Sequence, residues 1–401
     1  GNVISAALSF LMMFGAAKFL APNYFGEFSL LLSYIAILEI VLNMGVSSAL
    51  IGYVNRGTGV FLISRRLNLL CFSMIISISF CIVLIIAICI FTRVFSFPIN
   101  YLPMVLVVSF GMSLYSNFVA IAQSKQEWGK QNALIILNSF LRISFILVAY
   151  FYVNFINLKE DEAFNVILDS LLLYGLTIIA ISIFFLLREE IYKFTFSIIE
   201  ARKAFTYIIP IAISNLVIIL FMRVDALLIV YFLGVAELAK YSAANILGMS
   251  IPLITRALMN VSFSIASTKG NEYIGIIWKR QLKILPFIIL ATLLLILISP
   301  FVMNFLYLEK YPGTELVFFL LSLGYLWGIY IVPLESFFYA TNPKRILVYK
   351  SSGLFFLCLF GPILIIYMGI FGAALSVFLA KLVSWTIIIS DAYKHNSKLT
   401  N

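Results

Sequence analysis

The chain of 401 residues is 63% apolar and only 11% charged, with a mean hydropathy of +1.10. A soluble domain carries about a quarter charged residues because its surface faces water, so this composition excludes a water-soluble fold and indicates a surface solvated by lipid. The net charge of +10 does not indicate nucleic-acid binding, because the basic residues stand in short connections between apolar segments, as is typical of membrane proteins.

Long apolar runs predict membrane-crossing helices, since about 20 residues are needed to cross a hydrocarbon layer of about 30 Å. Twelve such runs follow one another along the chain, at 2–20, 29–54, 68–92, 102–123, 132–153, 167–187, 206–232, 239–266, 283–307, 315–340, 349–368 and 370–391. The connections are too short to hold a folded domain outside the membrane. The predicted fold class is therefore an all-α integral membrane protein.

The two halves of the chain resemble each other. Phe19-Leu20 with Glu27-Phe28-Ser29 aligns with Phe232-Leu233 and Lys240-Tyr241-Ser242 at an offset of 213 residues. We therefore expect two six-helix bundles in the same orientation, over 1–187 and 206–391. A cytoplasmic linker at 188–205 joins them, and a cytoplasmic tail follows at 392–401. In transporters with parallel repeats the substrate site lies between the repeats, near the middle of the membrane.

The distribution of basic residues predicts the orientation in the membrane. Eighteen Lys and Arg residues, with Lys350 among them, stand in the even-numbered connections and the C-terminal tail, and four stand in the odd-numbered connections. This asymmetry predicts that both termini are cytoplasmic. Since a basic segment normally precedes a first helix of this orientation and the chain starts inside an apolar run, we expect a few N-terminal residues to be missing from this sequence.

Several kinds of chemistry are not supported. The four cysteines lie in apolar stretches without a CxxC pattern, and His395 is the only histidine. These residues predict neither a metal site nor a disulfide framework, and no catalytic residues are expected. No Walker A sequence is present, so energy for transport would come from the membrane potential or from a proton or sodium gradient, without a bound cofactor.

Eight ionisable residues fall inside the predicted spans, where each costs roughly 2.5–3.5 kcal/mol if it faces lipid. They are Lys18, Glu39, Arg142, Arg223, Asp225, Arg256, Glu335 and Lys381. We expect them to line a wet cavity, to pair with each other, or to reach the headgroups. Five bases against three acids leave an excess of +2, which suits an anionic cargo such as phosphate or pyrophosphate.

Helical spacing adds neutral polar side chains to this set. Asn245, Arg256 and Asn260 share one face of the eighth predicted helix; Glu39 and Asn43 share a face of the second, and Asn138 and Arg142 a face of the fifth. The candidate substrate-binding residues are thus Arg142, Arg256, Arg223, Lys381, Lys18, Asn138, Asn43, Asn260 and Asn245. The candidates for binding a coupling proton or sodium ion are Asp225, Glu39 and Glu335. A structural alternative stays open for Lys18, which could lie at the headgroups, and for Arg223, Asp225 and Glu335, which could serve helix packing.

Motifs in chain order resemble those of polysaccharide flippases of the Wzx type. Residues 18–29, KFLAPNYFGEFS, resemble the first-loop signature of that family, and Asn43-Met44-Gly45-Val46 is similar to its next motif, in which the first position is more often Asp. Later motifs are similar at Arg223-Val224-Asp225, Ala340-Thr341-Asn342-Pro343-Lys344 and Gly369-Ile370-Phe371-Gly372-Ala373-Ala374. Since Asn43 departs from the pattern, an acidic role is not carried over to that position.

This resemblance implies the multidrug/oligosaccharidyl-lipid/polysaccharide exporter superfamily, with two MATE-like bundles around a central cavity that works by alternating access. It further implies a flippase that moves a polyprenyl-diphosphate-linked oligosaccharide, an O-antigen or capsule or exopolysaccharide repeat unit, from the cytoplasmic to the outer leaflet of the bacterial inner membrane. The implied partners are the lipid-linked oligosaccharide, membrane lipids and other membrane proteins of polysaccharide assembly.

Two other functions stay open. A cation-coupled multidrug exporter would share the fold, and the basic excess argues against it. A membrane-embedded polysaccharide polymerase would be equally hydrophobic, but such enzymes usually carry a large extracytoplasmic loop with catalytic basic residues. The longest such loop here, near 154–166, is short and acidic.

Overall fold

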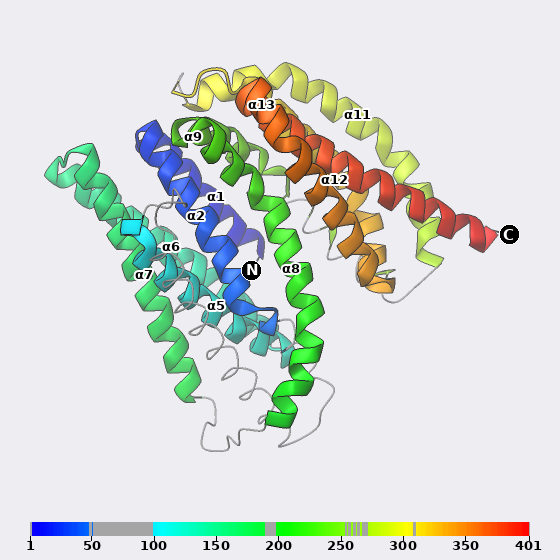
Figure 1. The fold of residues 1–401 in the computed structure, drawn as a ribbon, viewed down its shortest axis with the longest axis horizontal. Helices are drawn as coiled ribbons and strands as arrows, with labels where there is room; N and C mark the ends of the chain where they lie inside the picture. Colours follow the sequence, from blue (N-terminus) through cyan, green and yellow to red (C-terminus); the bar gives the residue numbers. More distant parts are fainter. Residues whose placement is uncertain are drawn as a thin grey trace. The chain divides into compact units, whose positions relative to one another are not determined.

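A computed structural model describes residues 2–47, 50, 99–188, 198–252, 272–307 and 310–400, with six further positions between 255 and 266. The regular structure in these residues is helical (Figure 1). The helices are α1 (Asn2–Phe19), α2 (Pro22–Asn43), the short 3₁₀ helix η2 (Ile99–Tyr101), α5 (Leu102–Ser124), α6 (Trp128–Ile156), α7 (Glu160–Arg188), α8 (Ile198–Leu233), α9 (Val235–Gly248), α11 (Glu272–Tyr307), α12 (Glu315–Thr341) and α13 (Pro343–Thr400).

Within the described residues, nine helical stretches are long and apolar enough to cross a membrane. The longest, Lys344–His395, bends at Gly369, whose φ of 61° and ψ of −141° are accessible to glycine and not to other residues, so that α13 contains two of the predicted spans. The predicted all-α membrane fold is confirmed. The predicted span 68–92 lies outside the described residues, and α9 covers only the first part of the predicted span 239–266.

The second helix differs from its predicted bounds. It begins at Pro22, where the fixed φ of proline suits a first helical turn, and it ends at Asn43 rather than at 54. Met44 and Gly45 have φ of 44° and 74°, values that interrupt a right-handed helix. A hydropathy window does not detect this break, because the apolar composition continues across it.

The chain divides into two compact units. Residues 1–12 and 31–219 form one, and residues 13–30 and 220–401 form the other. The turn between α1 and α2 therefore belongs to the same unit as the C-terminal helices. The predicted division into two halves rests on the sequence repeat and stays a prediction. It comprises halves at 1–187 and 206–391, a linker at 188–205 and a tail at 392–401.

The unit of residues 1–12 and 31–219 is built around α5, which packs against α6 and α7 (Figure 1). The large side chains of Tyr115, Phe164 and Tyr174 are almost completely buried among these helices. The hydroxyl of Tyr115 donates to the carbonyl of Leu134 at 2.9 Å, which joins α5 to α6. Polar contacts of this kind are needed because lipid cannot satisfy a buried hydroxyl.

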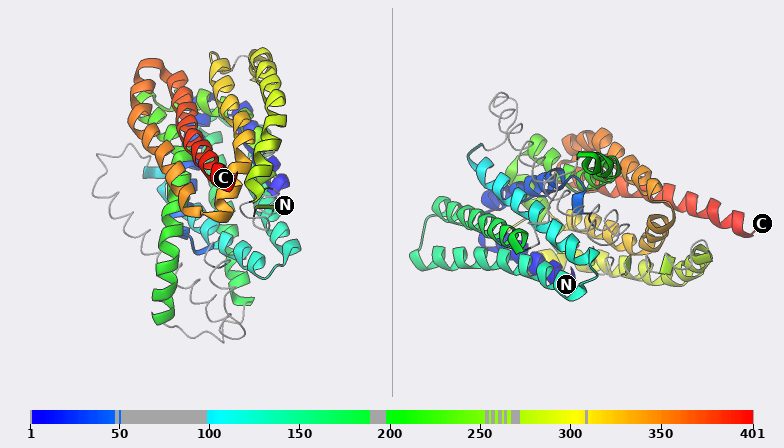
Figure 2. Two further views of the ribbon diagram at one scale, coloured as in Figure 1. Left: turned by 90° about the vertical axis from the view of Figure 1, so that its right-hand side faces the viewer. Right: turned by 90° about the horizontal axis from the view of Figure 1, so that it is seen from below.

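In the unit of residues 13–30 and 220–401, α12 packs between α11 and α13, and the pair α11 and α12 runs side by side (Figure 2). Its core is aromatic and aliphatic, with Phe337, Phe338, Tyr349 and Trp385 at the centre. The beginning of α2 packs on the first turn of α9, where a Cβ added to Gly26 would lie 2.2 Å from the carbonyl oxygen of Val235. Glycine is therefore required for this close approach.

Candidate substrate and ion sites

Asp225 of α8 is buried, with 7% of the residue exposed. One carboxylate oxygen accepts a hydrogen bond from the Ala226 amide at 2.8 Å, and the other accepts from the Tyr241 hydroxyl of α9. The charges of Arg223 and Lys381 also act on this carboxylate. The free-energy cost of burying this carboxylate is thus offset by two hydrogen bonds and two basic groups within the same unit.

Lys381 of α13 belongs to the same cluster of polar side chains as Asp225. Its Nζ lies 3.7 Å from the centroid of the Tyr325 ring, whose hydroxyl donates to the Asn245 side chain at 2.8 Å. The Lys381 Nζ is buried and has no hydrogen-bond partner among the residues that the structure describes. Tyr241 and Asn245 are four residues apart on α9 and face the same side of that helix. The arrangement therefore connects Asp225 to Lys381 through α9 and α12.

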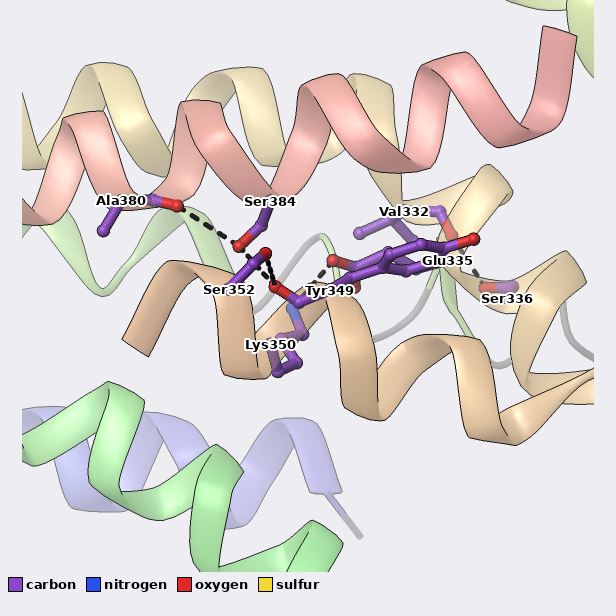
Figure 3. Close-up of polar contacts among 8 residues, drawn as sticks. All are labelled: Val332, Glu335, Ser336, Tyr349, Lys350, Ser352, Ala380 and Ser384. Carbon is purple, nitrogen blue, oxygen red and sulfur yellow. Dashed lines mark hydrogen bonds and ion pairs between the residues drawn. The ribbon is translucent and has the colours of Figure 1, made fainter. Parts of the chain in front are cut away.

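Glu335 of α12 forms an ion pair with Lys350 of α13. The Lys350 Nζ lies 2.7 Å from a carboxylate oxygen of Glu335, with 19% and 12% of the two side chains exposed. Figure 3 shows the two side chains meeting next to the backbone of Tyr349, whose carbonyl accepts hydrogen bonds from Ser352 and Ser384 at 2.8 Å each. Of the three candidate ion-binding acids, Glu335 is thus the one with a lysine partner in direct contact.

The other unit brings together three of the predicted residues. The Arg142 guanidinium of α6 donates to the Ser9 hydroxyl of α1 at 2.6 Å and interacts electrostatically with Glu39 of α2. One turn away on α6, Asn138 accepts a hydrogen bond from the buried Tyr174 hydroxyl of α7 at 2.6 Å. Arg142, Glu39 and Asn138 therefore belong to one polar cluster that four helices contribute to.

Asn43 lies at the last residue of α2 and is 7% exposed. It contacts Ser47 beyond the break of α2 and a group of polar residues on α5. Lys18, by contrast, is exposed in the last turn of α1, and its backbone carbonyl accepts from Lys310 at 2.9 Å. Arg256 and Asn260 lie outside the described residues.

Sequence reasoning missed several members of these clusters. Lys350 was counted as a connection residue, because it follows the short polar stretch at Pro343 to Arg345, but it lies inside α13 and is largely buried. The tyrosines Tyr174, Tyr241 and Tyr325 are not among the predicted site residues, because a single aromatic residue in an apolar run is typical of helix packing. A signal was available for Tyr241 alone, through its position four residues before Asn245.

The chain has known relatives. Residues 1–267 match the family model described as polysaccharide biosynthesis protein. The chain belongs to this family. The predicted family resemblance is therefore confirmed at this level, and no curated protein matches the chain.

Comparison with solved structures shows which fold the chain adopts. The structure of "Lipid II flippase MurJ, inward closed conformation" is 15% identical, with 96% of this chain and 85% of that chain covered and a TM-score of 0.76. An inward-facing multidrug resistance MATE family transporter of the MOP superfamily is 16% identical, with 99% and 95% covered and a TM-score of 0.70. The chain thus has the MATE-like fold of this superfamily, as the sequence predicted.

Proposed function

We propose that the chain is a flippase that moves a polyprenyl-diphosphate-linked oligosaccharide, an O-antigen or capsule or exopolysaccharide repeat unit, from the cytoplasmic to the outer leaflet by alternating access. The family description, polysaccharide biosynthesis protein, supports a role in glycan assembly. A fold similar to that of a lipid II flippase supports a lipid-linked cargo. The proposed location is the bacterial inner membrane with both termini cytoplasmic, and other polysaccharide-assembly membrane proteins are the proposed partners.

The observation that carries this proposal is the buried amine of Lys381. An ammonium group has three donors, and the Lys381 Nζ, which lies over the Tyr325 ring, has no hydrogen-bond acceptor among the described residues. A buried ammonium without acceptors is costly, and an anionic phosphate oxygen would supply the missing acceptor. In the other unit, Arg142 offers a guanidinium that can bind a phosphate in a bidentate manner. Each of these two groups, within its own unit, is a proposed contact for a phosphate oxygen of the cargo.

The acids have a separate proposed role. With Glu335 paired to Lys350, Asp225 and Glu39 remain as proposed binding groups for a coupling proton or sodium ion. Both lie beside a basic residue, Asp225 beside Arg223 and Glu39 beside Arg142. A change of protonation or of ion binding at either acid would alter the field at the neighbouring base, because charges interact strongly in a buried site. This provides a physical route from ion binding to cargo binding.

The experiment is complementation of a bacterial strain that lacks its own flippase, with the glycan at the cell surface as readout. Wild type, Lys381→Met, Lys381→Arg and Arg142→Ala are compared at equal protein level. Lys394→Met serves as the control, because it removes an exposed lysine of the same helix, α13. We expect rescue by wild type and by the control, partial rescue by Lys381→Arg, and loss with Lys381→Met and Arg142→Ala.

Two other outcomes would contradict parts of the proposal. Rescue by every variant would assign Lys381 and Arg142 to packing rather than to cargo binding. No rescue by wild type, together with lowered drug sensitivity of the cells, would favour a multidrug exporter, whose fold is equally compatible with the MATE neighbours.

A further inference from the structure

One face of α12 combines two glycines with a buried acid. Gly324, Gly328 and Glu335 lie within about 40° of each other around the helix axis, because successive residues are offset by about 100°. We call these three residues the glycine face. Lysines of α13 contact both of its ends. A Cβ added to Gly324 would lie 3.3 Å from the Lys381 Nζ, and Glu335 pairs with Lys350 at 2.7 Å (Figure 3).

The middle of the glycine face is open. A Cβ added to Gly328 would meet no atom of the described residues within 4 Å, although Gly324, Ile331 and Val332 on the same side of α12 are buried. Glycine also weakens a helix relative to alanine, so close packing of α12 does not explain the choice of glycine at this position. The absent side chain of Gly328 leaves a space that the described residues do not fill.

Other sides of α12 are occupied by helices of the same unit. The Tyr325 hydroxyl donates to Asn245 of α9, and the Tyr330 carbonyl accepts from Gln281 of α11, both at 2.8 Å. The glycine face, by contrast, carries charged groups at both of its ends. An ionisable side chain that faces hydrocarbon is costly, so these charges indicate that the space at Gly328 holds water or a polar ligand rather than lipid tails.

The two amines beside the glycine face have unused donors. The Lys381 Nζ is buried and has no acceptor among the described residues, and the Lys350 Nζ, which has three N–H groups, donates only to Glu335 among them. The charges of Lys350, Glu335 and Asp225 act on Lys381, and Arg223 acts on Asp225. Three bases against two acids leave an excess of one positive charge here. The ligand that would use the free donors is an anion with several oxygen atoms.

We propose that the phosphate of the cargo lies on the glycine face, and that Gly328 is the residue whose missing side chain makes room for it. This inference rests on the proposed function, because it assigns a place in this unit to the phosphate of the lipid-linked oligosaccharide. A rise of 1.5 Å per residue puts Gly328 about 6 Å from Gly324 and about 10 Å from Glu335 along the helix axis. A phosphate at Gly328 therefore lies between the Lys381 and Lys350 amines, both of which can donate charge-assisted hydrogen bonds to its oxygens.

The test places a cysteine at Gly328 in the full chain, purified in detergent, after Cys71, Cys81, Cys89 and Cys358 are replaced by alanine. The cysteine is labelled with a negatively charged methanethiosulfonate reagent, alone or with farnesyl diphosphate, uncharged farnesol or phosphatidylglycerol. We expect Gly328→Cys to react, and farnesyl diphosphate at ten times its dissociation constant to slow the reaction roughly tenfold, because only about a tenth of the sites stay free. Farnesol and phosphatidylglycerol should protect far less.

Gly129→Cys in the same background is the matched control, because Gly129 is an exposed helical glycine of α6 at which an added Cβ also meets no atom within 4 Å. It should react without protection by farnesyl diphosphate. The proposal is overturned if Gly328→Cys does not react, or if farnesol protects it as well as farnesyl diphosphate does. Equal protection by phosphatidylglycerol would also overturn it, since the face would then bind the headgroup of an ordinary membrane lipid.

Gly328→Leu tests the same face in cells that lack their own flippase. Leucine favours a helix and fills an open space, so we expect the melting temperature of wild type but loss of the surface glycan, while Gly129→Leu complements like wild type. Gly328→Ala adds a single methyl group; should the leucine variant fail to fold, the alanine variant should fold and reduce the surface glycan. Full complementation by both Gly328 variants would overturn the proposal.

The two measurements separate this proposal from the proposed function. Protection of Gly328→Cys by farnesyl diphosphate, without complementation by wild type, would support the phosphate site and contradict the flippase. Complementation by wild type without protection would support the flippase and contradict the phosphate site.

Discussion

The Lys350 Nζ lies 2.7 Å from the Glu335 carboxylate and joins α13 to α12 where both side chains are largely buried (Figure 3). Lys350→Met removes the amine and leaves the carboxylate without its counter-charge. Breaking a buried pair on one side costs about 3–5 kcal/mol, so we expect a clearly lower melting temperature for the purified protein. Combining Lys350→Met with Glu335→Gln should recover most of this loss, because the uncompensated charge is then absent.

Lys344→Met is the control for this pair, since Lys344 is an exposed lysine in the first turn of the same helix. Surface lysines contribute little to stability, so this variant should melt within a degree or two of wild type, that is, within about 0.5 kcal/mol. Equal melting of Lys350→Met and Lys344→Met would show that the ion pair contributes nothing to the fold.

The two residues of this ion pair also show what can and cannot be predicted from the sequence. Glu335 was identified as an intramembrane acid because it interrupts a long apolar run, and its position in α12 agrees with that prediction. Lys350 was assigned to a connection because charges near a run boundary are read as loop residues. The helix in fact begins at Pro343 and includes Lys350. Within the part of the chain that the structure describes, a hydropathy pattern predicts the order of the helices well, but it places their ends poorly.

Contacts between helices are the part that the sequence leaves open. The shared helical face of Glu39 and Asn43 can be predicted from spacing alone, since these residues are four apart. The Asn43 partners Ser116 and Asn117 lie 73 and 74 residues away along the chain. No local pattern specifies which face of α5 meets α2, because the apolar residues of both helices suit many crossing arrangements. The contacts of Asn43 with α5 therefore required the structure.

Lys310 stabilises the end of α1 through backbone contacts. Its Nζ donates to the carbonyls of Ala17 at 3.1 Å and Lys18 at 2.9 Å, and also to the carbonyl of Leu20. These carbonyls lack partners inside the helix, and a cation also interacts favourably with the helix dipole there. We expect Lys310→Met to cost about 1.5–3 kcal/mol, the range for hydrogen bonds to charged groups, measured as a drop in melting temperature.

Lys159→Met tests whether this effect depends on the contacts with α1. Lys159 is an exposed lysine in another connection between helices, so its loss should leave the melting temperature unchanged. If the two variants behave alike, the three carbonyl contacts of Lys310 do not stabilise the fold. A cysteine placed at Phe19 should also react faster with a polar thiol reagent in the Lys310→Met background, because the end of α1 would open more often.

Tyr241 holds the carboxylate of Asp225 through a hydrogen bond from its hydroxyl. Tyr241→Phe removes only this donor and keeps the ring in place, so the expected cost in stability is about 1.5–3 kcal/mol. Complementation should also be impaired if Asp225 has the proposed ion-binding role. Tyr367→Phe makes the same chemical change at a tyrosine that is 84% exposed, and it should alter neither stability nor complementation.

Gly26 offers the sharpest steric prediction. A Cβ at this position would lie 2.2 Å from the Val235 carbonyl oxygen and 2.7 Å from a methyl carbon of the same residue. Since backbone cannot yield as a flexible side chain does, Gly26→Ala must separate α2 from the first turn of α9 and should cost at least the roughly 1–3 kcal/mol typical of overpacking. Gly129→Ala, on α6, meets no atom within 4 Å and should be neutral or stabilise by up to about 1 kcal/mol. Thermal unfolding of the two variants side by side decides the point: if Gly26→Ala is tolerated as well as Gly129→Ala, α2 and α9 do not pack at this distance.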